Sequence, residues 1–373
     1  MTHPAVATAA APASSGEANA PEETHCALVE EAVRVAVQTN HFVVAADAMA
    51  ALLRARGADA IDLLHEFVGT TQKYAIPPTS RFYVGAAALG ASGAVFLGVN
   101  VEFPGLPLNA SVHAEQFALV TALRANETRL VAIATTAAPC GHCRQFMNEL
   151  RHASELCCVI PEDAKAPGGR PGAKFARYAL RELLPHSFGP LDLTHDVKLP
   201  LLLESRHNRL AFADDDDGGG GGGGATTSGG GGGGGGGATG RERENAAAEA
   251  LLATREACFA YAPYSHSPAG LALTTSSGGV YAGRSVESAA YNPSMSPLHV
   301  ALVAATCGER YSEDGGGGGG GGGDGGWGVT SATLAEVDGA AVSYEGWCRL
   351  MLGVIAPGVA LTVVKLKRED VAA

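Results

Sequence analysis

Two short motifs carry the side chains best suited to chemistry. "VHAEQ" contains His113 and Glu115, and "APCGHCRQF" contains Cys140 and Cys143. One imidazole and two thiolates give Zn²⁺ three protein ligands and leave its fourth tetrahedral position to water. Zinc lowers the pKa of that water toward neutrality, and a nearby carboxylate that does not bind the metal can move protons. The pattern predicts one hydrolytic zinc site per chain, with Glu115 as the catalytic proton shuttle.

The spacing of these residues places them at the beginnings of helices. Cys140 and Cys143 are three positions apart, so they share one face of a first helical turn. Pro139 suits a helix start, and a helix N-terminus favours the thiolate form of both cysteines. His113 and Glu115 would diverge in mid-helix, but in a first turn both can reach one centre. We therefore expect zinc between two helix N-termini.

Weaker interpretations of the motifs remain open. A lone C-x-x-C is also found in redox sites and in half of a structural zinc site, although no second pair with suitable spacing follows in this domain. The ordered combination matches the H-x-E…P-C-x-x-C signature of zinc deaminases. We expect His142 to be exposed because the ligand set is already complete. Arg144 could pair with a ligand thiolate or with a partner chain.

The surrounding sequence predicts the elements that hold these motifs. "DAMAALLRARG" and "DAIDLLHEFVG" predict helices with N-caps at Asp47 and Asp59, the first ending at Gly57. Residues 82–103 predict a β-hairpin that turns at 90–93. A helix from "HAEQFALVTALRA", a strand from "LVAIATTAA", a helix from "CGHCRQFMNELRHA" and a strand from "CCVIP" follow. This order implies an α/β fold with a mixed sheet covered by helices.

The second half of the chain repeats the first. Sliding the sequence on itself by 185 positions aligns identical residues without gaps. The matched positions are Ala75, Pro78, Ser80, Gly85, Ala87, Gly93, Gly98, Val101 and Glu102, each identical to the residue 185 positions later. Glycine and proline matches at fixed spacing indicate shared turns, so we expect a second copy of the same fold.

Composition narrows the function and the compartment. The net charge of −12 argues against nucleic-acid binding, which needs clustered cations. The absence of a run of 18 apolar residues predicts no membrane span. The N-terminal segment lacks the apolar region of a secretory signal, so we expect a cytoplasmic protein, with organelle import as the second alternative. The eight cysteines, Cys140 and Cys143 apart, are then expected to be reduced and mostly buried thiols.

Low-complexity segments suggest the domain boundaries. An Asp/Gly-rich stretch cannot bury apolar surface and predicts a flexible linker, and a second glycine block predicts a loop insertion. We expect a largely disordered tail at 1–38, a small helical segment at 39–74, a catalytic domain at 75–205, a linker at 206–240, and a degenerate domain at 241–373 with a loop insertion at 308–328.

The motifs resemble the two-domain, homodimeric cytidine deaminases. "VNVEFPG", "HAEQF", "APCGHCRQFMNEL", "YAPYS" and "ESAAYNPSMSP" carry the likeness, which covers roughly residue 47 to the C-terminus apart from the glycine blocks. It implies a duplicated three-layer α/β/α fold, a homodimer, and deamination of cytidine and 2′-deoxycytidine in pyrimidine salvage. It also implies that His113, Cys140 and Cys143 bind zinc. The implied substrate contacts are Phe82 stacking on the base, Asn100 and Glu102 holding the ribose 3′-hydroxyl, and the backbones of Ala114 and Ala138 binding the base edge.

The second copy lacks the catalytic side chains. At an offset of 185, Leu298 and Val300 stand where the first copy has His113 and Glu115. No Asp or Glu occurs between Glu287 and Glu309, so no local shift of register restores a proton shuttle. The C-x-x-C is also missing, with Glu345 and Cys348 at the corresponding places. We therefore expect His299 to bind no metal and to lie on a helix surface or at an interface.

Two further hypotheses stay open from the sequence alone. One is a polynucleotide-editing deaminase, which the acidic charge disfavours. The other is a non-enzymatic, zinc-stabilised protein in which the duplicated domain serves as an assembly platform.

Overall fold

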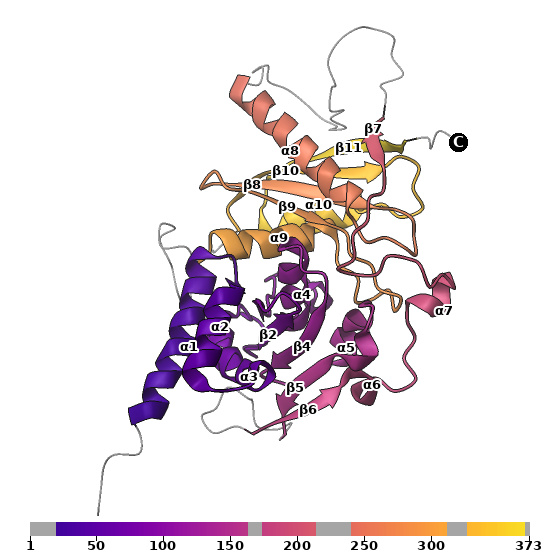
Figure 1. The fold of residues 1–373 in the computed structure, drawn as a ribbon. Coiled ribbons are helices and arrows are strands. Elements are labelled where there is room, and N and C mark those ends of the chain that lie inside the picture. The colour runs from indigo at the N-terminus through magenta and orange to yellow at the C-terminus, as the bar shows by residue number, and fades with distance from the viewer. Residues whose placement is uncertain (1–19, 163–173, 214–239, 312–326, 370–373) are drawn as a thin grey trace, which may run out of the picture.

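The computed structural model describes residues 20–162, 174–213, 240–311 and 327–369, and Figure 1 shows two sheets, each covered by helices. The first half contains α1 (Ala20–Thr39), β1 (Val43–Val44), α2 (Ala46–Arg56), α3 (Ala60–Thr71), β2 (Gly85–Gly90), β3 (Val95–Val99), α4 (Ala114–Arg124), β4 (Leu130–Thr135), α5 (Gly141–Met147), β5 (Cys157–Pro161), β6 (Phe175–Ala179), α6 (Leu180–Leu183) and α7 (Pro190–Thr194). The second half contains β7 (Leu210–Phe212), α8 (Gly240–Cys258), β8 (Ala269–Thr275), β9 (Val280–Arg284), α9 (Pro297–Gly308), β10 (Val329–Val337), α10 (Glu345–Ile355) and β11 (Leu361–Arg368).

The first sheet is mixed, as the sequence predicts. Its order is β1-β3-β2-β4-β5-β6, and only the pair β4–β5 is parallel. Glycine lets helices approach both faces: a Cβ at Gly85 would overlap the Val68 carbonyl oxygen of α3, and one at Gly98 would overlap the Ala114 carbonyl oxygen of α4. α3 and α4 therefore pack closely against opposite faces of the sheet.

The second sheet repeats this arrangement, so the predicted duplication is confirmed. Its order is β7-β11-β10-β8-β9, with β10–β11 as the parallel pair. Gly270 faces the backbone of α8 as Gly85 faces α3, and Gly283 faces α9 as Gly98 faces α4. The repeated glycines thus mark equivalent close contacts between a helix and a sheet.

The two halves pack against each other through α4 and α9, which lie between the sheets (Figure 1). One hydrophobic cluster runs through both halves. Polar contacts join them as well: Gln116 Nε2 donates to the Pro293 carbonyl at 2.9 Å, and Arg124 donates to the Ala282 carbonyl at 3.0 Å. The helix that carries the predicted catalytic Glu115 is therefore covered by the second copy.

Several predicted boundaries are wrong. The segment expected to be a disordered tail up to residue 38 forms α1 from Ala20, because Val29, Val33 and Val37 recur at helical spacing and are buried. Residues 1–19 lie outside the described residues. The N-cap of α2 is Ala45 rather than Asp47, while Asp59 caps α3 as predicted by accepting from the backbone N–H of Ile61.

The domain limits also shift. The segment at 39–74, expected to precede the catalytic domain, supplies β1 and α3 and so forms part of that domain. The expected linker at 206–240 begins with ordered chain, because β7 pairs with β11 and Asn208 donates to backbone carbonyls near the end of α8. Most of the two glycine blocks, 214–239 and 312–326, lies outside the described residues. No described helix is long and apolar enough to cross a membrane.

Candidate metal centre and active site

The candidate metal centre lies where two helices begin. His113 is the N-cap of α4 and Cys140 is the N-cap of α5, both with extended backbone angles. Cys143 follows in the first turn of α5 and is fully buried. α4 follows the hairpin and α5 follows the carboxyl end of β4, so the sheet brings both N-termini together. The three predicted ligands thus lie at two neighbouring helix N-termini.

The spacing of the three side chains fits a tetrahedral metal. His113 Nδ1 lies 3.5 Å from Cys140 Sγ and 3.3 Å from Cys143 Sγ. The three candidate ligand atoms all lie within 4.8 Å of one another. Typical Zn–N and Zn–S bond lengths at a tetrahedral angle require an N···S separation of about 3.6 Å. The donor set and its geometry therefore suit zinc without rearrangement.

The group has the electrostatics of a ligand set. Hydrogen bonds from Cys143 and His113 lower the pKa of Cys140 to about 3, and the bond with Cys140 raises the pKa of His113. The hydrogen bond with Cys140 and burial raise the pKa of the Cys143 thiol. The three side chains thus share protons that a cation would displace on binding.

Glu115 lies in the first turn of α4, next to the ligands. It is buried, and burial raises the pKa of its carboxyl group, with smaller opposing effects from a backbone hydrogen bond and from the charge of His113. A raised pKa makes a carboxylate a better proton acceptor, which suits a group that takes up a proton and passes it on. Its position and environment therefore suit proton transfer at this centre.

The expected ribose contacts are hydrogen-bonded to the loop before β2. Glu102 Oε2 accepts from the backbone N–H groups of Thr79 and Ser80 at 3.0 and 2.9 Å, and the side chain is buried. Asn100 Oδ1 accepts from the Val84 N–H, and its Nδ2 donates to the Phe82 carbonyl, each at 2.8 Å. Asn100 thus holds the backbone that presents Phe82.

The remaining expected contacts differ in exposure. The Phe82 side chain is 52% exposed, so it does not belong to the core. Ala114 is buried at the start of α4, whereas Ala138 is exposed just before α5. The exposed ring of Phe82 and the exposed residue Ala138 are both accessible from solvent.

His142 differs from expectation, and the contacts of Arg144 are with the backbone. His142 is only half-buried rather than exposed: its ring stacks on His113 with centroids 4.9 Å apart, and its buried Nε2 has no hydrogen-bond partner among the described residues. Within the described residues Arg144 pairs with no ligand thiolate, and its contact with a partner chain stays a prediction. Its guanidinium donates to the carbonyls of Pro139 and Leu183, which fixes the residue before Cys140.

Sequence reasoning missed Gln116. Its Oε1 accepts from the His113 N–H at 3.2 Å while its Nε2 donates to Pro293 in the second domain. Gln116 therefore links a candidate ligand to the other half of the chain. Its place three residues after the N-cap, where a capping box has Glu or Gln, was the available signal.

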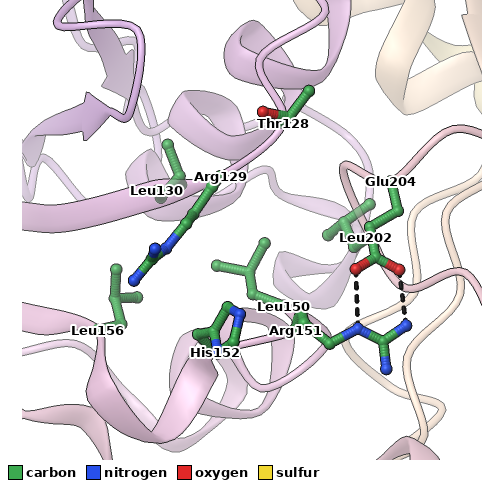
Figure 2. A pocket seen from close by; sticks show the side chains of 9 residues that line it. All are labelled: Thr128, Arg129, Leu130, Leu150, Arg151, His152, Leu156, Leu202 and Glu204. Carbon is green, nitrogen blue, oxygen red and sulfur yellow. Dashed lines mark hydrogen bonds and ion pairs between the residues drawn. The ribbon is translucent and has the colours of Figure 1, made fainter. Parts of the chain in front are cut away.

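A separate cavity of about 130 Å³, drawn in Figure 2, lies near the opposite end of β4. Arg151 and Glu204 form a two-bond ion pair at its edge, with separations of 2.8 and 2.7 Å. Leu130, Leu150 and Leu156 supply apolar walls. The small volume and the paired charges set this cavity apart from the metal centre.

In the second copy three of the four equivalent positions are buried, and Glu345 at the fourth is partly buried. Leu298, Val300 and Cys348 are buried. Among the described residues, no second group of His, Cys, Asp or Glu side chains comes together as His113, Cys140 and Cys143 do. His299 is buried between the halves, with Nε2 2.9 Å from the Ala110 carbonyl oxygen and Nδ1 2.9 Å from Ser296 Oγ. Of the two expected settings, helix surface and interface, the structure shows an interface.

Comparisons with known proteins agree with the site. Two family models, each describing the zinc-binding region of cytidine and deoxycytidylate deaminases, match residues 60–159 and 180–348. Fold and site thus define a zinc-binding deaminase with a duplicated domain, and the metal is zinc.

Individual similar proteins distinguish between the kinds of deaminase that the two family models cover. Cytidine deaminase 1 of Arabidopsis thaliana is 40% identical over 305 residues, which cover 81% of this chain and 89% of that protein. Cytidine deaminase of Yersinia pestis (strain Pestoides F) is 39% identical over 231 residues, covering 62% of this chain and 63% of that protein. The crystal structure of cytidine deaminase from Mycobacterium tuberculosis is 32% identical, with 35% of this chain and 97% of that chain covered and a TM-score of 0.28. The chain belongs to the cytidine deaminase family, which confirms the predicted resemblance.

Proposed function

We propose that His113, Cys140 and Cys143 hold the zinc of this enzyme and that Glu115 moves the protons of the reaction. The chain is a zinc-dependent enzyme that deaminates cytidine, as its family membership indicates. The observation that carries the assignment of residues is the convergence of the three donor atoms within 4.8 Å, beside a buried carboxyl group in the first turn of α4.

Bound zinc would supply an acidified water as the nucleophile. Glu115 would accept the proton released from that water and deliver it to N3 of the pyrimidine. As the oxygen of that water bonds to C4, Glu115 would take its remaining proton and pass it to the amino group, whose bond to C4 then breaks, so that the products are uridine and ammonia. Burial of Glu115 keeps bulk water from competing for these protons.

Glu115→Ala tests the proton shuttle. We expect the purified variant to keep about one zinc per chain, because no ligand is changed, and to lose roughly 10²–10⁴-fold in kcat. Zinc is measured by atomic absorption and activity by uridine formation. Glu155→Ala, which removes an exposed carboxylate elsewhere, is the matched control. A Glu115→Ala variant with full zinc and near-normal kcat would exclude Glu115 as the shuttle.

We also propose that Glu102 and Asn100 bind the ribose through its 3′-hydroxyl and that Phe82 stacks on the base, while the backbones of Ala114 and Ala138 bind the base edge. Two backbone N–H groups fix the Glu102 carboxylate, so it is preorganised to accept from a hydroxyl. Because the 3′-hydroxyl is present in both nucleosides, cytidine and 2′-deoxycytidine should both react, whereas 3′-deoxycytidine should react poorly. Glu102→Gln should reduce this discrimination, and equal kcat/KM values for all three nucleosides in the unchanged enzyme would contradict the assignment.

We propose a homodimer that acts in pyrimidine salvage in the cytoplasm. Phe82 and Tyr83 are consecutive aromatic residues, each about half exposed beside the candidate site, and a partner chain would cover such a surface. Sedimentation should give twice the chain mass of 37.7 kDa. Cell fractionation tests the compartment.

A further inference from the structure

The second domain contains a cavity of about 340 Å³ that plays no part in the reaction described above. Tyr264, Ser265, Glu287, Ser288, Val342 and Tyr344 are among its lining residues. Small-molecule sites typically start near 300 Å³, so the cavity is large enough for a nucleoside.

The acidic group in this cavity has the same backbone donors as Glu102, and the Ser265 hydroxyl donates to it as well. Glu287 stands 185 positions after Glu102, and its Oε2 accepts from the backbone N–H groups of Tyr264 and Ser265 at 3.0 and 3.1 Å. These two donors stand 185 positions after Thr79 and Ser80, which donate to Glu102. The carboxylate of the second copy is therefore held by the same backbone groups as the first.

The neighbouring polar position is also retained in part. Ser285 stands in place of Asn100, and its Oγ accepts from the Ala269 N–H at 3.1 Å. In the first copy, Asn100 accepts from Val84, the equivalent N–H. The loop geometry around the sugar-binding end is thus kept although the side chain has changed.

In contrast to these hydrogen bonds, the catalytic side chains of the first copy have no counterpart in the second. Leu298 and Val300 occupy the places of a zinc ligand and the proton shuttle, and both are buried. Neither residue lines the cavity, and the described part of the second domain holds no group of metal-binding side chains, so a ligand there would meet no zinc-activated water. It would bind without being deaminated.

The walls select the charge of the ligand. Among the described residues that line the cavity, none is Lys, Arg or His, and Glu287 supplies a negative charge. A phosphate would be repelled, whereas hydroxyl donors would be attracted. The rings of Tyr264 and Tyr344 offer surfaces against which a planar base can pack.

We propose that this cavity is a non-catalytic binding site for a neutral nucleoside, whose sugar hydroxyls donate to Glu287 and whose base lies against the tyrosines. The inference rests on the proposed function of Glu102 as the ribose contact, from which the role of Glu287 is carried over. The site gives each chain two nucleoside sites of unlike chemistry, one that reacts and one that only binds.

Equilibrium dialysis of the zinc-loaded full-length protein with labelled uridine tests the proposal, because uridine is not deaminated. We expect close to two uridines per chain at saturation. Val342→Trp should reduce the number to one with kcat on cytidine unchanged, because the larger side chain fills the cavity and leaves the hydrogen bonds of Glu287 intact. Glu287→Gln should do the same. Uridine 5′-monophosphate should fail to displace the second uridine.

The outcomes separate this proposal from the assignment of Glu102. Glu102→Gln should abolish uridine binding at the catalytic site and lower kcat/KM. A Glu102→Gln variant without these effects would count against the proposed function alone. One uridine per chain in the unchanged protein, or two in both second-domain variants, would overturn the second site. If Val342→Trp instead dissociates the dimer, the cavity is a subunit interface and the proposal is wrong. Should Glu287→Gln not fold, Val342→Trp decides the question.

Discussion

Replacing His299 should change how stability depends on pH. The ring is 8% exposed, and burial lowers its pKa to about 4, with the bond to Ala110 opposing the shift. The folded chain therefore keeps His299 neutral, while the unfolded chain binds a proton below its ordinary pKa of about 6.5. The stabilisation is full above pH 6.5 and is lost as the pH falls toward 4. Linkage gives a loss of about 1.8 kcal/mol between pH 7 and pH 5.

Urea unfolding at both pH values measures this effect as a difference between proteins. His299→Gln should be the less stable protein at pH 7, because the amide does not reproduce the packing of the buried ring against Phe103 and Trp347. The difference in free energy of unfolding between the variant and the unchanged protein should be about 1.8 kcal/mol smaller at pH 5 than at pH 7. Taking the difference cancels the pH dependence of zinc binding. His152→Gln, at an exposed position, is the control and should show no such change. A gap for His299→Gln that stays constant within about 0.5 kcal/mol would refute a neutral buried ring.

Three other predictions concern the metal, the contact between domains and the close packing of helices. Cys143→Ser should bind less zinc and lose activity in proportion, as measured by atomic absorption and uridine formation; normal zinc content would contradict its role as a ligand. Glu149→Ala should lower the free energy of unfolding by about 2–4 kcal/mol in urea, because it leaves two tyrosine hydroxyls and the Ala289 N–H without their acceptor; a loss below about 0.5 kcal/mol would argue against a buried network. Gly98→Ala should lower the free energy of unfolding by about 1–3 kcal/mol, because its Cβ meets backbone atoms of α4. At Gly346 a Cβ meets no described atom within 4 Å, so Gly346→Ala should not destabilise the protein. Equal melting temperatures of the two variants would contradict the close approach.

Local chemistry made the metal centre predictable. His113, Cys140 and Cys143 are chemically distinctive, and their spacing within each motif fixed the helix ends that carry them. The repeated glycines were equally informative, because Gly85 and Gly98 are required by close helix contacts that recur at Gly270 and Gly283. Patterns that a few neighbouring residues enforce can be read from one sequence.

Long-range contacts were not predictable in the same way. His299 is buried because Ala110, 189 positions earlier, accepts its Nε2 hydrogen bond. The segment from residue 20 becomes helical because Val29, Val33 and Val37 meet a core formed elsewhere, although its composition resembles a disordered tail. In each case the deciding partner is distant in the chain, so no local pattern reports it.

A structural role as a hydrogen-bond acceptor accounts for Glu287 but not for the cavity beside it. Two backbone N–H groups need an acceptor, and a buried carboxylate satisfies them whether or not a ligand binds. Elsewhere the second copy replaced catalytic side chains with Leu298 and Val300 and closed the space around them. A structural acceptor requires the carboxylate but not the 340 Å³ of open volume beside it. The uridine stoichiometry of Val342→Trp, which fills that volume and spares the acceptor, therefore distinguishes a retained binding site from a retained loop anchor.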